Sequence, residues 1–561
     1  MTAGDDVRRR MGRPLRVAAA AALALATAAV APSAAMPAAA AAPADHTEVR
    51  MMAINGFEGN LRPPGDTGGA GYLSSYLDQL RGAADASLLF STGDNVGDTP
   101  FESAYFHDEP SIEFLNSQGL TASAIGNHDL DHGFAELRQL QTGGCHPVDG
   151  CRFTPQFSGA AFPMVGSNLK LDSGLPATLP FAVSYAGSTP VGTIAITQKD
   201  LATRVAPAGI ADVTVADPLQ TINRTAELLR FLGVRAIVLL MHEDLEVPAD
   251  TADGCARATG PARPIIDNAS PAVDIIFTGG SSQSFACTFL DPDNRPRTVV
   301  QATPGGTGVA VADVTIDPAT GDVLRDRVSA FNQVVRHDIS PDPAAVALVD
   351  RATAMAAENG RRTVGAAPVA LTRKTDAAGE STLGELIADA QLAATRGAGA
   401  QVALTNPGGI RADLPAGRIT YSDVFSAQPF RNRLHTLTLT GAQLDAALEQ
   451  QFRPAGGDDP DGNGRTRIVL QPSAGLTYTV DPAAPLGHRV SDIRLHGTVL
   501  PADAPIRVTV NAFLAEGGDG FSAFTLGTDP VIGVLDTEAL ADHLHGRSPV
   551  TPPDRDRITV R

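Results

Sequence analysis

The sequence lacks three features, and each absence argues against a class of protein. There is no excess of positive charge, since 62 acidic residues stand against 43 basic ones and the formal net charge is −19; this argues against a nucleic-acid partner. Beyond the N-terminus, no apolar run is long enough to span a membrane. The four cysteines include no Cys-x-x-Cys pair, which argues against a four-cysteine zinc site.

Length and composition are those of a globular protein. The chain has 561 residues, more than one hydrophobic core usually supports. Apolar residues make up 43% and charged residues 19% of the chain, which are ordinary values for globular proteins. We therefore expect more than one folded domain. Because the chain is acidic overall, an anionic substrate would need a local basic pocket.

The first 45 residues have the pattern of a segment that directs export. Five arginines in residues 8–16 precede an alanine-rich apolar run, and small residues suited to cleavage lie between about Ala35 and Ala42. The alternative is a membrane anchor helix, which the proline-broken, alanine-rich run disfavours. We expect residues 1–45 to be a signal peptide and spacer, and the mature protein to be secreted. The choice between the Sec and twin-arginine routes stays open.

Four cysteines fit an exported protein with disulfides. Cys145 and Cys151 are six residues apart, and Cys255 and Cys287 are 32 residues apart. Four cysteines allow three pairings, and the spacing alone does not choose among them. Proximity in the sequence favours Cys145–Cys151 and Cys255–Cys287.

From Val49 to about Ile316, short apolar runs alternate with helical patterns. This alternation is typical of α/β proteins, whose buried strands carry functional residues at their carboxyl ends. A proline-led helical segment at 340–362 predicts a linker helix, and a second domain follows from residue 363. Five strand ends close on polar or glycine-containing turns: INGFEGN (54–60), STGDNVGD (91–98), AIGNHDLD (124–131), LMHEDL (240–245) and FTGGSS (277–282).

The third of these turns carries the clearest chemical signal. Asn127, His128 and Asp129 place an amide oxygen, an imidazole and a carboxylate directly after a strand. A carboxylate beside a histidine can orient the ring, which can then protonate a leaving oxygen or hold a phosphate. Taken alone, the same residues also fit a solvated surface turn. Other motifs in the chain are needed to choose between these two interpretations.

The chain resembles the secreted 5′-nucleotidases, which join a calcineurin-like metallophosphoesterase domain to a C-terminal nucleotide-recognition domain. The resemblance runs from about Val49 to Val534. It implies an α/β (α+β) fold with a metallophosphoesterase-like β-sandwich flanked by helices (46–339), a linker helix (340–362) and a separate α/β nucleoside-binding domain (363–561). The stretches that carry it are GDNVGDTPFESAYFHDEPSIEFLNSQGL, GNHDLDHGFAEL, NPGGIRADL, SDVFSAQPF and NAFLAEGGDGF.

The resemblance implies a phosphatase centre with two divalent ions, which clamp the phosphate and generate a hydroxide. Of the seven ligand positions that the family would supply, this chain retains three: Asp94 as the bridging carboxylate, Asn127 as the amide and His242 as an imidazole. His128 and Asp129 match the catalytic pair beside the metals. The four replaced ligand positions hold Gly56, Glu58, Gly280 and Ser282.

These replacements affect the two implied ions unequally. One ion would keep only Asp94, with Glu58 as an oxygen substitute. The other would keep Asp94, Asn127 and His242. A tight site usually needs three or four protein ligands, so we expect at most one divalent ion, manganese- or zinc-like and weakly held. Losing either ion of a pair removes several kcal/mol of transition-state stabilisation, which corresponds to about a thousandfold or more in rate.

The second domain retains the contacts that the resemblance implies for a nucleoside. Phe430 and Phe513 match two aromatic rings that sandwich a base, and Asp519 matches a carboxylate that binds ribose hydroxyls. Ala377 stands where some members have a second phosphate-facing arginine. Two isolated phenylalanines would more often belong to a core, and the ordered set favours a binding site. The full set is Arg373, Asn406, Gly408, Gly409, Arg411, Phe430, Phe513 and Asp519.

Three interpretations follow. The favoured one is an exported protein that binds nucleotides or nucleosides and whose phosphate-ester hydrolysis is lost or strongly weakened. The second is a working metal-dependent 5′-nucleotidase with an altered or single-metal centre. The third is a structural surface protein in which both sites are vestigial. The expected partner is a nucleotide or nucleoside, and the sequence indicates neither a preferred base nor a protein partner.

Overall fold

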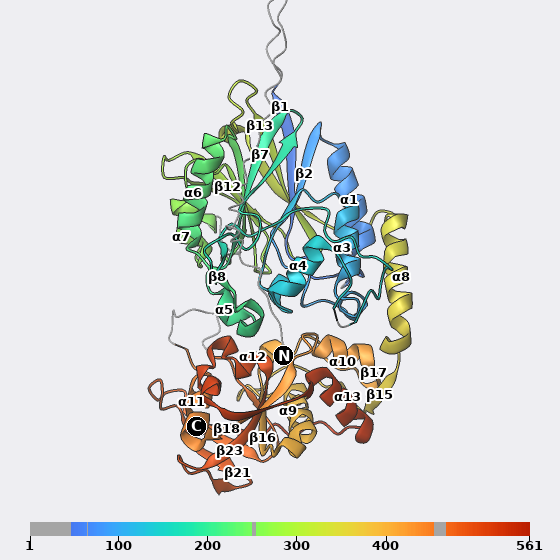
Figure 1. Cartoon of the computed structure of the whole chain (residues 1–561), viewed down its shortest axis with the longest axis vertical. Helices are drawn as coiled ribbons and strands as arrows, with labels where there is room; N and C mark the ends of the chain where they lie inside the picture. The colour runs from blue at the N-terminus through green and yellow to red at the C-terminus, as the bar shows by residue number, and fades with distance from the viewer. Residues whose placement is uncertain (1–45, 64, 148, 249–253, 454–466) are drawn as a thin grey trace, which may run out of the picture. The chain divides into compact units, whose positions relative to one another are not determined.

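The computed structural model describes residues 46–63, 65–147, 149–248, 254–453 and 467–561 (Figure 1). The expected signal peptide lies outside the described residues. From His46 to Arg561 the chain forms one compact unit. Within its described part, none of the helices combines the length and the apolar character that crossing a membrane requires.

The N-terminal part contains two six-stranded sheets. The first has the strand order β14-β13-β1-β2-β3-β4, and the second has the order β11-β12-β10-β9-β7-β6. In the first sheet the strands are β1 (Thr47–Ile54), β2 (Ala86–Ser91), β3 (Ala122–Ala124), β4 (Met164–Val165), β13 (Gly308–Ile316) and β14 (Ser329–Val334). In the second they are β6 (Ala182–Ala186), β7 (Thr189–Thr197), β9 (Ala236–His242), β10 (Ile275–Gly279), β11 (Phe285–Leu290) and β12 (Pro296–Gln301).

The two sheets face each other across an apolar core, and helices cover their outer faces. Val49, Met51 and Ala53 of β1 pack in the core between the sheets. Met52 and Ile54 of the same strand pack instead with the helices, as expected when successive side chains point to opposite faces. The first sheet is covered by α1 (Ala70–Gly82), α3 (Glu109–Ser117) and α4 (Phe134–Thr142), and the second by α6 (Pro218–Phe231) and α7 (Ala262–Asn268).

The helix α8 (Pro343–Gly360) occupies the expected linker segment. It begins after Asp342, whose side chain accepts hydrogen bonds from two backbone N–H groups of the first turn. A five-stranded sheet with the order β19-β16-β23-β18-β24 follows. Its strands are β16 (Val402–Thr405), β18 (Arg433–Thr440), β19 (Gln471–Pro472), β23 (Pro505–Asn511) and β24 (Thr528–Leu535), with α9 (Thr382–Thr395), α10 (Tyr421–Ala427), α11 (Gly441–Glu449), α12 (Ala512–Ala515) and α13 (Asp536–Gly546).

The structure confirms the α/β fold class and both favoured disulfides. Cys145 is bonded to Cys151, and Cys255 is bonded to Cys287. The second bond ties a short 3₁₀ turn to β11. The domain boundaries at residues 340 and 363 stay predictions.

Candidate active site

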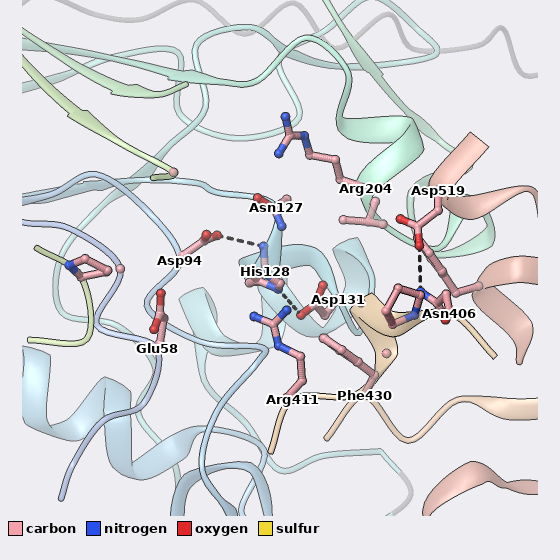
Figure 2. A pocket seen from close by; sticks show the side chains of 18 of the residues that line it. Glu58, Asp94, Asn127, His128, Asp131, Arg204, Asn406, Arg411, Phe430 and Asp519 are labelled. Carbon is pink, nitrogen blue, oxygen red and sulfur yellow. Dashed lines mark hydrogen bonds and ion pairs between the residues drawn. The ribbon is translucent and has the colours of Figure 1, made fainter. Parts of the chain in front are cut away.

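The expected turns meet at one edge of the two sheets. In the first sheet β1 is parallel to β2 and β2 to β3, and in the second β9 is parallel to both β7 and β10. Parallel strands present their carboxyl ends at the same edge. A cavity of about 780 Å³ lies there, and its lining combines these turns with loops of the C-terminal sheet (Figure 2).

The three retained ligand residues are brought together. The Nε2 atom of His242 lies 3.0 Å from Oδ2 of Asp94. The other oxygen of Asp94 accepts a hydrogen bond of 2.8 Å from the backbone N–H of His128. Asn127 lines the same cavity, and its Oδ1 atom accepts a hydrogen bond of 2.6 Å from Gln198.

The ring of His242 is held in a fixed orientation toward Asp94. Its Nδ1 atom lies 2.8 Å from the carbonyl oxygen of Thr92 and donates to it, which directs Nε2 at Asp94. Nε2 is buried, and the carboxylate of Asp94 is its ion-pair partner. Although burial opposes the charged ring, Asp94 raises the pKa of His242 to about 9. The space between the two side chains therefore suits a proton or a cation.

Two of the replaced positions, Gly56 and Gly280, have backbones adapted to glycine. Their φ angles are +49° and +97°, in the left-handed region that favours glycine. A Cβ atom on Gly56 would lie 2.9 Å from Oε1 of Glu58, and one on Gly280 would lie 3.0 Å from Oδ1 of Asp244. Neighbouring carboxylates thus fill the space that a side chain at either position would enter. Ser282 is exposed at the cavity lining.

Glu58 and Asp94 lie in the same buried acidic region, but their pKa values are shifted in opposite directions. Burial and the nearby Asp94 raise the pKa of Glu58 to about 7. Burial also opposes ionisation of Asp94, but His242 and His128 outweigh that effect and hold the pKa of Asp94 below its usual range. Asp94 is therefore anionic at neutral pH, whereas Glu58 is only partly ionised.

The structure pairs His128 with Asp131 rather than with Asp129. The Nδ1 atom of His128 lies 2.8 Å from Oδ2 of Asp131, as Figure 2 shows. Burial disfavours the charged ring, but Asp131 and Asp94 raise the pKa of His128 to about 10. Asp129 points the other way, and its carboxylate accepts four backbone N–H groups at 2.8–3.3 Å from Gly126 and residues 94–96. Asp129 thereby holds two neighbouring turns together.

All the residues expected to bind the nucleoside line the same cavity. Asn406 donates a 2.8 Å hydrogen bond to Asp519 and accepts one of 3.1 Å from Asn511. The rings of Phe430 and Phe513 are partly buried at the cavity wall. The expected residues in the lining are Arg373, Asn406, Gly408, Gly409, Arg411, Phe430, Phe513 and Asp519.

The two expected arginines differ in how they are held. Arg411 forms an ion pair with Asp98, and its guanidinium lies 5.9 Å from the centre of the Phe430 ring. Arg373 is about half exposed and lies 3.5 Å from Asp413. Arg411 is therefore held by a carboxylate and lies near an aromatic ring, whereas the guanidinium of Arg373 also donates to the carbonyl oxygen of Ile410 at 3.3 Å.

Sequence reasoning missed several polar residues of the site. Asp131 and Asp244 were overlooked although each lies within a turn that had been singled out, because spacing along a turn does not reveal side-chain direction. Arg204, in the short helix α5 (Leu201–Arg204) after β7, also lines the cavity. Its guanidinium contacts Asp200 at 3.0 Å and Asp244 at 3.8 Å.

A second group of potential metal ligands lies away from this lining. Donor atoms of His107, His146 and Asp149 lie within 4.8 Å of one another. His107 is already bracketed by two carboxylates, at 2.9 Å from Asp149 and 3.3 Å from Glu136. Asp149 also pairs with Arg152 at 2.7 Å. The cluster is therefore held together by ion pairs among protein side chains.

The chain is similar in sequence to a family model and to several known proteins. The family model described as "5'-nucleotidase, C-terminal domain" matches residues 362–526. Endonuclease YhcR of Bacillus subtilis is 29% identical over 518 residues, which are 90% of this chain and 40% of that protein. The cell wall protein Lmo0130 of Listeria monocytogenes is 29% identical over 540 residues, covering 86% of this chain and 65% of that protein. This chain thus spans less than two thirds of either relative.

Two further proteins match over most of their length. The snake venom 5'-nucleotidase of Naja atra is 25% identical over 484 residues, covering 81% of this chain and 85% of that protein. Among solved structures, the 5'-nucleotidase precursor of Thermus thermophilus superposes with a TM-score of 0.71 at 26% identity, covering 91% of this chain and 99% of that one. Chains with whole-length similarity to this one therefore include 5′-nucleotidases.

Proposed function

This chain belongs to the 5′-nucleotidase family, and on that premise we propose that it is an exported protein that binds nucleotides or nucleosides, with the family's phosphate-ester hydrolysis strongly weakened. The observation that carries the proposal is one continuous cavity. At one wall stand Phe430, Phe513 and Asp519, and at the other Asp94 and Asn127. A nucleoside monophosphate fits this polarity, with its base between the rings and its phosphate toward the strand ends.

Several groups of this chain suit a phosphate at the strand-end wall. His128 is cationic at neutral pH because its pKa is about 10, so it can donate a hydrogen bond to a phosphate oxygen. Arg411 offers a planar guanidinium, which matches phosphate geometry. Asp94, Asn127 and His242 are the residues that would hold a divalent ion. When bound, such an ion would neutralise phosphate charge.

The replaced residues support weakened hydrolysis. Gly56 offers no side-chain ligand, Ser282 is exposed, and Glu58 is a partly protonated carboxyl group. For one of the two ions that the family implies, Asp94 is thus the strong ligand that remains. Losing one of two paired ions costs about a thousandfold or more in rate.

Binding is tested by calorimetry with adenosine, AMP and ribose 5-phosphate on the mature chain. We expect adenosine and AMP to bind, and the double variant Phe430→Ala plus Phe513→Ala to lose adenosine binding. Phe231→Ala is the matched control, because that ring is 86% exposed on α6. Adenosine binding unchanged in the double variant would contradict the proposal. Export is tested separately by N-terminal sequencing of the secreted protein, which should begin between about residues 36 and 43.

The second candidate is a working phosphohydrolase with one metal ion. It is favoured by the buried pair of His242 and Asp94, in which Nε2 lies 3.0 Å from Oδ2, because a divalent ion could take the place of the proton between them. The test is hydrolysis of AMP with added Mn²⁺. A rate comparable with that of a two-metal relative, which depends on Mn²⁺ and disappears in Asp94→Ala, would favour this candidate over the weakened enzyme.

A further inference from the structure

The side chain of Asn511 connects the start of a helix to the residues expected to bind a nucleoside. Asn511 is the last residue of β23 and the cap of α12, where its Oδ1 atom accepts a hydrogen bond of 2.9 Å from the backbone N–H of Leu514. The side chain is buried and belongs to the cavity lining. The backbone N–H thus fixes which end of the amide is the oxygen.

That bond sets the direction of a chain of hydrogen bonds. Because Oδ1 of Asn511 is the acceptor for Leu514, the other end of the amide is the nitrogen, which donates to Oδ1 of Asn406 at 3.1 Å. Nδ2 of Asn406 then donates to Oδ2 of Asp519 at 2.8 Å, as Figure 2 shows. An ionised carboxylate accepts hydrogen bonds and donates none, so the chain ends properly on Asp519.

The backbone of Asp519 has a conformation that requires support. Its φ and ψ angles are +53° and 21°, in the left-handed region, and it stands between Gly518 and Gly520. A residue other than glycine is uncommon in that region and stays there when its surroundings hold it. Arg453 donates to the carbonyl oxygen of Asp519 at 2.7 Å, and Asn406 holds the carboxylate. Separate donors therefore fix the main chain and the side chain of Asp519.

Gly408 and Gly409 leave the space in which this chain of hydrogen bonds lies. A Cβ atom on Gly409 would lie 3.0 Å from Oδ1 of Asn406 and 3.6 Å from Nδ2 of Asn511. A Cβ atom on Gly408 would lie 3.4 Å from Nδ2 of Asn406 and 3.8 Å from Oδ2 of Asp519. Neither glycine has a positive φ angle, so the structural reason for small residues here is space beside the two hydrogen bonds.

We propose that Asn511 is a positioning residue for ribose recognition: through Asn406 it holds the carboxylate of Asp519, so that the site selects nucleosides that carry ribose hydroxyls over those that lack them. This inference deepens the proposed function and rests on it for the presence of a nucleoside. A carboxylate accepts hydroxyl donors in short, strong hydrogen bonds, and its orientation decides whether they align. Asn511 acts through Asn406 rather than by contact with the ligand.

The test is calorimetry on the mature chain with adenosine and with 2′,3′-dideoxyadenosine, which lacks both ribose hydroxyls. Wild type should bind adenosine at least about tenfold more tightly than the dideoxy compound. Asn511→Asp keeps an oxygen for the helix cap, which leaves Phe513 in place, but it presents an acceptor instead of a donor to Asn406. The Kd for adenosine should therefore rise at least about tenfold, while the Kd for dideoxyadenosine should change by less than about twofold.

Asn116→Asp is the matched control. The amide of Asn116 is also bonded at both ends, donating to the carbonyl oxygen of Gly159 at 2.9 Å and accepting from the backbone N–H of Ala161 at 2.6 Å. Asn116 is not among the described residues that line the cavity, so both Kd values should stay within about twofold of wild type. If Asn511→Asp does not fold, Asn511→Ser keeps a cap oxygen and removes the amide donor, and the same loss confined to adenosine is expected.

The results that would overturn the inference differ from those that would overturn the proposed function. An adenosine Kd equal to that of wild type in the Asn511 variant would refute the positioning role, and equal losses for both ligands would show damage to the whole cavity instead. Equal binding of both ligands by wild type would refute recognition of the ribose hydroxyls and leave nucleoside binding standing. A wild type that binds neither ligand would refute the proposed function and this inference with it.

Discussion

Gly518 fixes the position of the Phe513 ring and so offers a sharp test of base stacking. A Cβ atom on Gly518 would lie 2.5–2.6 Å from three atoms of that ring, which is far inside van der Waals contact. The ring cannot stay where it is in Gly518→Ala. Because Gly518 does not have a positive φ angle, the substitution adds little backbone strain, and its effect should be concentrated on Phe513.

The expected loss of adenosine affinity follows from the free energy that one stacked ring contributes. Stacking of a base on an aromatic side chain contributes about 1–3 kcal/mol. Since about 1.36 kcal/mol corresponds to tenfold, displacing Phe513 should raise the Kd for adenosine by about 5- to 150-fold. Ribose 5-phosphate lacks a base, so its Kd should change by less than about twofold.

Calorimetry on Gly518→Ala with both ligands checks this expectation. Gly546→Ala is the control, because a methyl group there meets no atom within 4 Å. An adenosine Kd equal to that of wild type would refute the stacking role of Phe513. Equal losses for adenosine and ribose 5-phosphate would instead show that the variant damages the whole cavity, and would refute the argument that Gly518 acts through the ring.

Three other substitutions should change stability or ligand affinity in a stated direction. Asp129→Asn should lower the free energy of unfolding by about 3 kcal/mol, measured in urea, because its carboxylate accepts four buried backbone N–H groups; no loss would contradict that role. Glu136 and Asp149 raise the pKa of His107, although burial of the charged ring acts in the opposite direction. The free energy of unfolding of wild type should therefore exceed that of His107→Gln by its full amount below about pH 6.5, and the difference should decline as the pH rises through the raised pKa. A difference that grows with pH would contradict this expectation. Arg411→Ala should raise the Kd for AMP at least about tenfold more than the Kd for adenosine, and equal changes would argue against a phosphate contact.

Much of the fold and part of the site follow from patterns that the sequence carries locally. Apolar runs that close on polar turns predict strands, and neighbouring parallel strands bring their carboxyl ends to one edge. The resemblance to the 5′-nucleotidases implied that Asp94, Asn127 and His242 share one site, and in the structure Asp94 contacts His242 while Asp94 and Asn127 line one cavity. The disulfide pairing also followed from proximity in the sequence.

The remaining features depend on side-chain direction, which spacing does not encode. The 3₁₀ turn from His128 to Leu130 places the carboxylate of Asp131, three residues on, beside the ring, whereas an adjacent carboxylate would have to bend back. The position of Asp244 likewise depends on the absence of a side chain at Gly280, on the neighbouring strand β10. The glycine of the turn FTGGSS thus leaves the space in which the carboxylate of Asp244 lies.

Under the proposed function, this chain binds nucleotides in a cavity whose hydrolytic centre is strongly weakened. The direct measurement is the kcat for AMP with Mn²⁺ present, alongside the Kd for AMP from calorimetry, with the Thermus thermophilus 5'-nucleotidase assayed in the same buffer. We expect saturable AMP binding and a kcat at least about a thousandfold below that of the relative. A kcat within about tenfold of the relative, abolished by Asp94→Ala, would contradict it.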